Sequence, residues 1–198
     1  MSPNLKAFLD TIAWSEIGPV LLAKSDNGYD ICVGSTPDHP IRFTDYSTHP
    51  RRHDPATDSD AAGRYQFMGR FWPEYQKQLS LPDFGPASQD KWCIQLIREC
   101  RALDDVEAGR FEDAVFKCRS RWASFPAAGY GQHENKLADM KRAYEAAGGR
   151  YAVDVGQPPQ PTLTLVPPPP VPVPKFSTAT PSLIDGIISV FAAIFGKK

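Results

Sequence analysis

Apolar residues recur at helical spacing at the start of the chain, with polar residues between them. The apolar positions follow the i, i+3, i+4 pattern of a helix that buries one face: Leu5, Phe8, Leu9, Ile12 and Ala13. Asn4 precedes this run and is suited to cap it, and Gly18-Pro19 follows it. The pattern predicts a first helix that begins after Asn4 and ends before Gly18.

The pattern changes after this helix. Residues 26–47 contain β-favouring side chains such as Ile31, interrupted by Gly34, and they predict a small β-element. Residues 48–62 are polar and contain prolines, which predicts a loop.

Helical spacing returns after Gly63. It predicts four further helices: 64–79, 87–103, 107–120 and 133–147. Gly148-Gly149 is suited to end the last of them. Together these elements predict an α+β fold, a mostly helical domain over residues 1–155 with a small β-element near its front.

The composition changes sharply near residue 156. Residues 156–181 hold ten of the chain's 20 prolines, a composition that favours extended polyproline II and predicts a semi-rigid linker. Residues 182–198 place their large apolar side chains on one side of a predicted amphipathic helix that ends in two lysines. That helix is too short to span a bilayer but suits a membrane interface, so we expect it to contact lipid. Docking on the domain or on a second copy is the alternative.

Charge and cysteine usage exclude several classes of function. The net charge is -1, and no basic stripe points to nucleic acid. The four cysteines and four histidines show no metal-ligand spacing, so we expect neither a metal nor an organic cofactor. We expect the cysteines to be reduced, as in a cytoplasmic protein, and the N-terminus has no signal-peptide pattern.

Glu16 is the first candidate for chemistry. It falls at the C-terminal end of the first helix, where the helix dipole disfavours a carboxylate, and neighbouring Trp14 and Ile17 could desolvate it. Both effects hold a proton on the side chain, as protonation of a glycosidic oxygen requires. A glutamate at a helix end is more often a solvated surface residue, so this feature alone does not establish catalysis.

A second candidate stretch lies at the start of the next helical region. Gly63 permits close approach of the backbone to a ligand, and Tyr65 and Gln66 offer a stacking face and hydrogen bonds suited to sugars. Packing in the core is the alternative for each aromatic residue.

Many short segments, in order and at similar spacing, resemble one family. They are Lys6-Ala-Phe-Leu-Asp10, Ala13-Trp-Ser-Glu16, Gly28-Tyr-Asp30, Phe43-Thr-Asp-Tyr-Ser47, His49-Pro-Arg51, Ala62-Gly-Arg-Tyr-Gln66, Lys77-Gln-Leu79, Ser88-Gln-Asp90, Trp122-Ala-Ser124 and Gly129-Tyr-Gly-Gln132. The chain resembles the lambda-type phage endolysins, lytic transglycosylases with a lysozyme-like fold, from about Leu5 to Asp154.

The resemblance implies roles for particular residues. It implies that Glu16 is the catalytic acid and base, and that Tyr46, Tyr65 and Gln66 lie in a saccharide cleft. Trp122 and Tyr130 are also carried over as substrate-binding residues, although either could be mainly structural.

The resemblance further implies the reaction. Glu16 would protonate the oxygen between N-acetylmuramic acid and N-acetylglucosamine, and the C6 hydroxyl of the muramic acid would close on its own anomeric carbon, giving a 1,6-anhydro end. A hydrolytic muramidase, with Asp30 or Asp45 as second carboxylate, is one alternative. A membrane-permeabilising protein that acts through residues 182–198 is another.

Partners and location follow from the same resemblance. We expect a monomer that binds peptidoglycan glycan strands and causes host lysis. We expect it to stay in the host cytoplasm until a holin releases it, and then to act at the cell wall.

Overall fold

The fold is described by a computed structural model, which defines residues 1–129 and 134–152. Eight helical elements follow one another in these residues: α1 (Pro3–Ile17), α2 (Pro19–Ala23), the 3-10 helix η1 (Gly69–Phe71), α3 (Trp72–Leu79), α4 (Pro86–Glu99), α5 (Leu103–Ala108), α6 (Phe111–Cys118) and α7 (Leu137–Ala146). The predicted linker over 156–181 and the predicted helix over 182–198 lie outside the described residues, as does Tyr130.

The first helix begins two residues earlier than predicted. The Ser2 hydroxyl accepts a hydrogen bond from the Leu5 N–H at 3.1 Å, so Ser2 rather than Asn4 is the N-cap. Pro3 occupies the first turn, where its missing N–H costs nothing. Asn4 instead joins distant segments, because its side chain donates to the Glu107 carbonyl and accepts from the Arg150 N–H. The predicted cap was therefore wrong, and the predicted end before Gly18 is confirmed.

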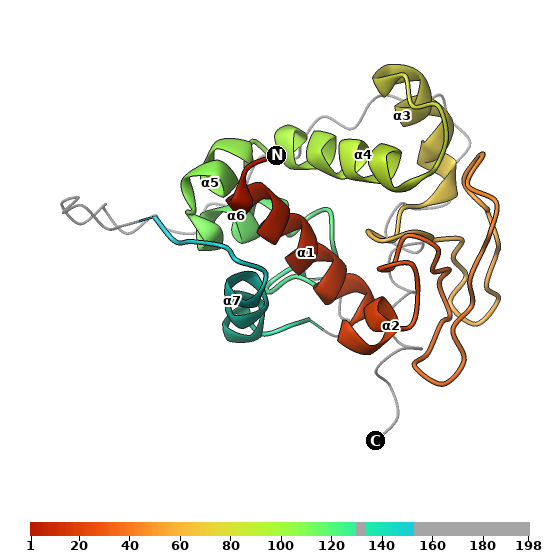
Figure 1. The fold of residues 1–198 in the computed structure, drawn as a ribbon, viewed down its shortest axis with the longest axis horizontal. Coiled ribbons are helices and arrows are strands. Elements are labelled where there is room, and N and C mark those ends of the chain that lie inside the picture. Colours follow the sequence, from red (N-terminus) through yellow and green to blue (C-terminus); the bar gives the residue numbers. More distant parts are fainter. Residues whose placement is uncertain (130–133, 153–198) are drawn as a thin grey trace.

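Helix α1 is the centre of the helical part of the molecule. It packs against α7, α5 and α2, and Figure 1 shows it running between the other helices. Its middle residues are buried on several sides, and Phe8 meets Phe111 at the start of α6 in an edge-to-face contact with ring centroids 5.9 Å apart. Burial of this helix explains why its C-terminal end, which carries Glu16, also lies inside the protein.

Residues 24–68, drawn in orange to yellow in Figure 1, lie beside the helices as a set of turns. The predicted β-element takes the form of isolated antiparallel bridges instead of strands: Ile31 with Arg42, Cys32 with Ala62, Asp54 with Ser59, and Ala62 with Phe67. The described residues contain no longer ladder than these.

The predicted helix over 64–79 forms only in its second half. Ala62 and Phe67 exchange two backbone hydrogen bonds of 2.9 Å and enclose a four-residue turn. Gly63 (φ 79°) and Gln66 (φ 51°) adopt left-handed backbone conformations, which an α-helix excludes. The helix therefore starts at Trp72.

The later helices match their predicted positions more closely. Predicted 87–103 is α4, and predicted 133–147 is α7, which is followed by Gly148 at φ 87°. The predicted helix 107–120 is divided between α5 and α6 by Gly109, whose φ of 76° ends a helix. All four cysteines are unpaired thiols. None of the helices within the described residues is long and apolar enough to cross a membrane.

Candidate active site

Glu16 is a buried carboxyl group at the end of α1. It is the last residue but one of the helix, and only 4% of its surface is exposed. Burial raises its pKa to about 8, against a smaller opposing effect of a hydrogen bond from Ser124. The sequence predicted this direction from the helix dipole and two neighbours, whereas burial by the whole fold is the main cause. The group therefore carries a proton at neutral pH.

A hydroxyl holds one oxygen of this carboxyl group. The Ser124 Oγ donates to Oε1 of Glu16 at 2.5 Å, and Ser124 itself is fully buried. The Ser124 Oγ also lies 2.7 Å from the Oγ of Ser15, the residue directly before Glu16. All of these contacts are with neutral groups, so they orient the carboxyl group without placing a cation beside it.

Asn135 joins the loop that carries Ser124 to helix α1. Its Nδ2 lies 2.9 Å from the Ser15 Oγ, 3.2 Å from the Ser15 carbonyl oxygen and 3.3 Å from the Ser124 carbonyl oxygen. Its backbone N–H donates to the same Ser124 carbonyl at 2.8 Å. These bonds fix the position of Ser124 relative to Glu16.

Tyr65 and Trp122, both predicted to bind substrate, are in contact with each other. Trp122 is buried, and its Nε1–H donates to the Tyr65 carbonyl at 3.4 Å. Tyr65 is 1% exposed and donates from its hydroxyl to Asp90 at 2.6 Å. Both side chains are therefore packed in the interior.

Gly63 was predicted to let the backbone approach a ligand, and it lies close to the side chain of Gln89 instead. A Cβ atom at this position would lie 2.2 Å from Oε1 of Gln89, which accepts the Arg64 backbone N–H. Gln89 also donates from Nε2 to the carbonyls of Tyr29 and Phe84 at 2.9 and 2.8 Å. Gly63 thus allows Gln89 to hold the turn against the neighbouring loops.

Gln66 is half-buried and held in the turn by its own side chain. Its Nε2 donates to the Gly63 carbonyl at 2.9 Å, which leaves Oε1 buried and without a partner among the described residues. A buried acceptor without a partner is costly, and this oxygen has essentially no exposed surface that a ligand could contact.

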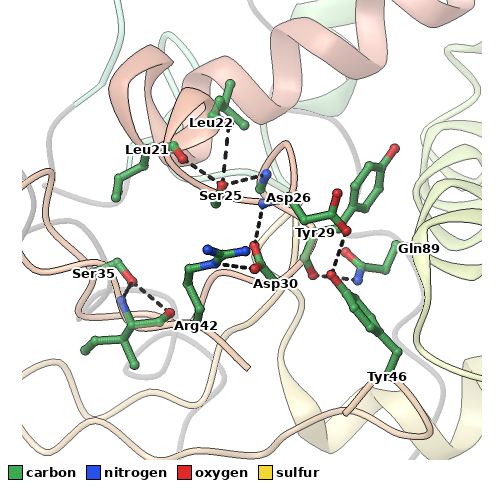
Figure 2. A network of polar contacts seen from close by, with 12 residues as sticks. Leu21, Leu22, Ser25, Asp26, Tyr29, Asp30, Ser35, Arg42, Tyr46 and Gln89 are labelled. Carbon is green, nitrogen blue, oxygen red and sulfur yellow. Dashed lines mark hydrogen bonds and ion pairs between the residues drawn. The ribbon is translucent and has the colours of Figure 1, made fainter. Parts of the chain in front are cut away.

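Tyr46 belongs to a separate network, which Figure 2 shows. Its hydroxyl donates to Asp26 at 2.9 Å, and its ring contacts Phe43 with centroids 5.1 Å apart. An open pocket of about 430 Å³ is lined by residues that flank Tyr46 in the sequence: Arg42, Phe43, Thr44, Asp45, Thr48, His49 and Pro50.

The two aspartates considered as a second carboxylate have other partners. Asp30 is buried, forms an ion pair with Arg42 and accepts the Asp26 N–H at 3.0 Å (Figure 2). Asp45 is exposed and accepts the Ser47 N–H at 2.8 Å. Arg64 pairs with neither aspartate and forms an ion pair with Asp10 at 2.5 Å.

Three residues of this site were missed by the sequence analysis: Ser15, Ser124 and Asn135. Ser15 adjoins Glu16, and Ser124 ends the segment Trp122-Ala-Ser124, so both stood in segments that carry the family resemblance. Nothing in the sequence connects Asn135 to Glu16. No group of three or more His, Cys, Asp or Glu side chains in residues 1–129 and 134–152 is arranged to hold a metal ion.

Comparison with known proteins places the chain in a family. The family model of the endolysins matches residues 6–151. The endolysin of Escherichia phage P2 is 49% identical over 154 residues, 74% of this chain and 93% of the relative, and that of Escherichia phage lambda is 45% identical over 148 residues, 73% and 90% of the two chains.

Solved structures agree. Bacteriophage lambda lysozyme in complex with a chitohexasaccharide matches with a TM-score of 0.68 and 41% identity, over 76% of this chain and 97% of that chain. A second structure of the lysozyme from bacteriophage lambda matches with a TM-score of 0.66 and 40% identity, over the same shares of the two chains. The chain has the lysozyme-like fold and belongs to the endolysin family of peptidoglycan-degrading phage enzymes.

Proposed function

We propose that this endolysin cleaves the β-1,4 bond between N-acetylmuramic acid and N-acetylglucosamine by intramolecular transglycosylation. The observation that carries the proposal is the buried, proton-bearing Glu16, whose hydrogen-bond partner among the described residues is a neutral hydroxyl. A carboxylic acid with a pKa near 8 is a proton donor at neutral pH and a proton acceptor once it has donated.

The proposed reaction uses this one group twice. Glu16 gives its proton to the glycosidic oxygen as the bond from that oxygen to C1 of the muramic acid breaks. The C6 hydroxyl of the same sugar then bonds to C1, and its proton passes to the Glu16 carboxylate. The product is a 1,6-anhydromuramic end, the acid is regenerated and no water is consumed. An attached nucleophile also gains from proximity.

The partners of Asp30 and Asp45 favour this reaction over hydrolysis. A hydrolase of the usual kind needs a second carboxylate that attacks the sugar or activates water. Asp30 is engaged by Arg42 and a backbone N–H, and Asp45 by the backbone of Ser47. Neither is held ready for that task.

We propose that glycan strands bind beside Glu16, with Gln66 and Tyr46 contacting sugar. The partly exposed positions of Gln66 and Tyr46 support this role. Gly63, Tyr65 and Trp122 would support the cleft from the interior. Tyr130, which lies outside the described residues, stays a proposed substrate-binding residue on the family resemblance alone. The chitohexasaccharide bound to bacteriophage lambda lysozyme supports a sugar chain as ligand.

The test is a digest of purified peptidoglycan with the wild type and Glu16→Gln, followed by mass spectrometry. We expect anhydro-muropeptides from the wild type and almost none from the variant, and Asp30→Asn and Asp45→Asn are the controls for a second carboxylate. Products heavier by one water would establish hydrolysis and contradict the proposal.

We also propose that residues 182–198, which follow the predicted linker over 156–181, bind a lipid surface. The apolar side of the predicted helix and its terminal Lys197 and Lys198 support this. Removal of residues 176–198 should abolish liposome binding and leave digestion of purified peptidoglycan unchanged. Equal liposome binding by both chains would contradict the idea.

A further inference from the structure

We propose that Asn135, Ser15 and Ser124 form a one-way chain of hydrogen bonds that keeps Oε1 of Glu16 an acceptor and assigns the transferable proton to Oε2. The inference rests on the proposed function in one respect, the role of Glu16 as acid. The three residues are positioning residues, since they act on Glu16 and not on the sugar.

The direction of the chain is set at Asn135. Its Nδ2 lies 3.2 Å from the Ser15 carbonyl oxygen and 3.3 Å from the Ser124 carbonyl oxygen, and carbonyl oxygens only accept. The atom at this position must therefore be the amide nitrogen, which only donates. Its shortest contact, 2.9 Å, is with the Ser15 Oγ, so Ser15 receives a hydrogen there.

The direction then passes through two hydroxyl groups. Each serine has a single hydrogen to donate. The amide nitrogen of Asn135 cannot accept the hydrogen of Ser15, and the other side-chain partner of Ser15 among the described residues is the Ser124 Oγ at 2.7 Å. Ser15 therefore donates to Ser124, and Ser124 donates its own hydrogen to Oε1 of Glu16 at 2.5 Å.

The last hydrogen bond, from Ser124 to Glu16, decides which oxygen of Glu16 carries the proton. A proton on Oε1 would face the hydrogen of Ser124, and relieving that clash would require both serines to reverse against the amide of Asn135. No described residue hydrogen-bonds Oε2. The proton therefore occupies Oε2, and one defined oxygen serves first as acid and then as base.

The chain of hydrogen bonds from Asn135 to Glu16 consists of neutral groups throughout. A lysine or arginine in the place of Ser124 would orient the carboxyl group as well, but it would favour the ionised form. Two hydroxyl groups and an amide hold the orientation while the proton stays in place at neutral pH.

The experiment measures the protonation of Glu16 directly, by carbon-13 NMR titration of labelled glutamate, together with the pH profile of kcat/KM. Removal of the charge-stabilising hydrogen bond in Ser124→Ala should raise the Glu16 pKa by about 1, move the basic limb of the profile upward and lower activity about tenfold. Ser124→Thr, which keeps a hydroxyl, should restore most of both.

Ser88→Ala is the matched control, because Ser88 is another buried serine that donates to a carboxylate, Asp83, at 3.0 Å. It should leave the titration of Glu16 unchanged. An unchanged Glu16 pKa in Ser124→Ala, or equal behaviour of Ser124→Ala and Ser124→Thr, would overturn the proposal.

Two further variants test the direction. Asn135→Asp replaces the donor by an acceptor, so the serines should reverse, Oε1 should lose its donor and the Glu16 pKa should rise. In the double variant Asn135→Asp, Ser15→Ala this rise in pKa should become smaller, because the hydrogen-bond chain between residue 135 and Ser124 is interrupted. An equal rise in the single and the double variant would mean that only the new charge acts, and it would overturn the proposed chain of hydrogen bonds.

These readouts separate two failures. The NMR titration does not depend on which products form. Normal digestion by Glu16→Gln would contradict the proposed function. An unchanged Glu16 pKa in Ser124→Ala would contradict only the proposed chain of hydrogen bonds.

Discussion

Two carboxylates of this protein have similarly small exposed fractions and behave in opposite ways. Glu16 at the end of α1 is 4% exposed, and burial raises its pKa to about 8. Asp105 in α5 is 6% exposed, and burial also acts to raise its pKa, but hydrogen bonds from Lys117 and Arg110 outweigh burial and lower it. Arg110 lies 2.7 Å from one oxygen, and Lys117 contacts the other.

The difference shows that burial alone does not decide the protonation of a carboxyl group. Both groups accept hydrogen bonds, but the donors of Asp105 are cations and the donor of Glu16 is a hydroxyl. Cations favour the ionised form much more than a neutral donor does. Asp105 is thus suited to fasten α5 to α6, and Glu16 to carry a proton.

Replacing Glu16 by glutamine removes the proton donor and should have the largest effect. We expect a loss of roughly a thousandfold in the rate of peptidoglycan digestion, since general acid catalysis supplies a contribution of that order. Clearing of a peptidoglycan suspension measures it. Asp105→Asn is the control and should digest at the wild-type rate, and comparable losses in both variants would break the distinction.

The same substitution should change how stability depends on pH. The pKa of Glu16 is raised in the folded state, so from about pH 5 to 8 the folded protein keeps a proton that the unfolded chain has lost. The free energy of unfolding should fall as pH rises through this window, by up to about 1.4 kcal/mol per pH unit from this group. Urea unfolding at pH 5 and pH 8 should show a smaller fall for Glu16→Gln, and parallel curves would refute the raised pKa.

Asp105→Asn should show the opposite dependence. Its folded pKa is lowered, so its stabilisation is present above the unfolded pKa near 3.9 and is lost as pH falls through the folded pKa. We expect the variant to be about 1–2 kcal/mol less stable at pH 7, an amount reduced because both cations are nearly half exposed. The difference from wild type should shrink below pH 4, and a constant difference would point to packing instead.

Lys117→Met should have the smallest effect. It removes one half-exposed cation while Arg110 remains, so we expect a loss of about 0.5 kcal/mol at pH 7. High salt should lower the stability of the wild type more than that of the variant, because it screens the Lys117–Asp105 pair, which only the wild type has. Thermal unfolding at two salt concentrations measures this, and an equal salt response would show that the ion pair contributes nothing.

The sequence predicted the helices with regular apolar spacing and did less well where turns interrupt it. The bounds of helices α4 and α7 were predicted to within a few residues, whereas residues 64–68 were predicted as helix and form a turn. Glutamine is not a residue type that predicts a left-handed backbone conformation. The two backbone hydrogen bonds between Ala62 and Phe67 impose that conformation on Gln66. The β-favouring residues after position 26 pair only in isolated bridges, since many turns keep ladders from growing.

The chain by itself determined that a helix ends just after Glu16 and that a proline-rich segment follows the domain, because both depend on neighbouring residues. Only the tertiary structure decided that Glu16 is buried and that its donor is Ser124, 108 residues away along the chain. Contacts over that distance arise from packing of α1 against the loops and α7, and local spacing carries no record of them. The proton on Glu16 is therefore a property of the folded protein.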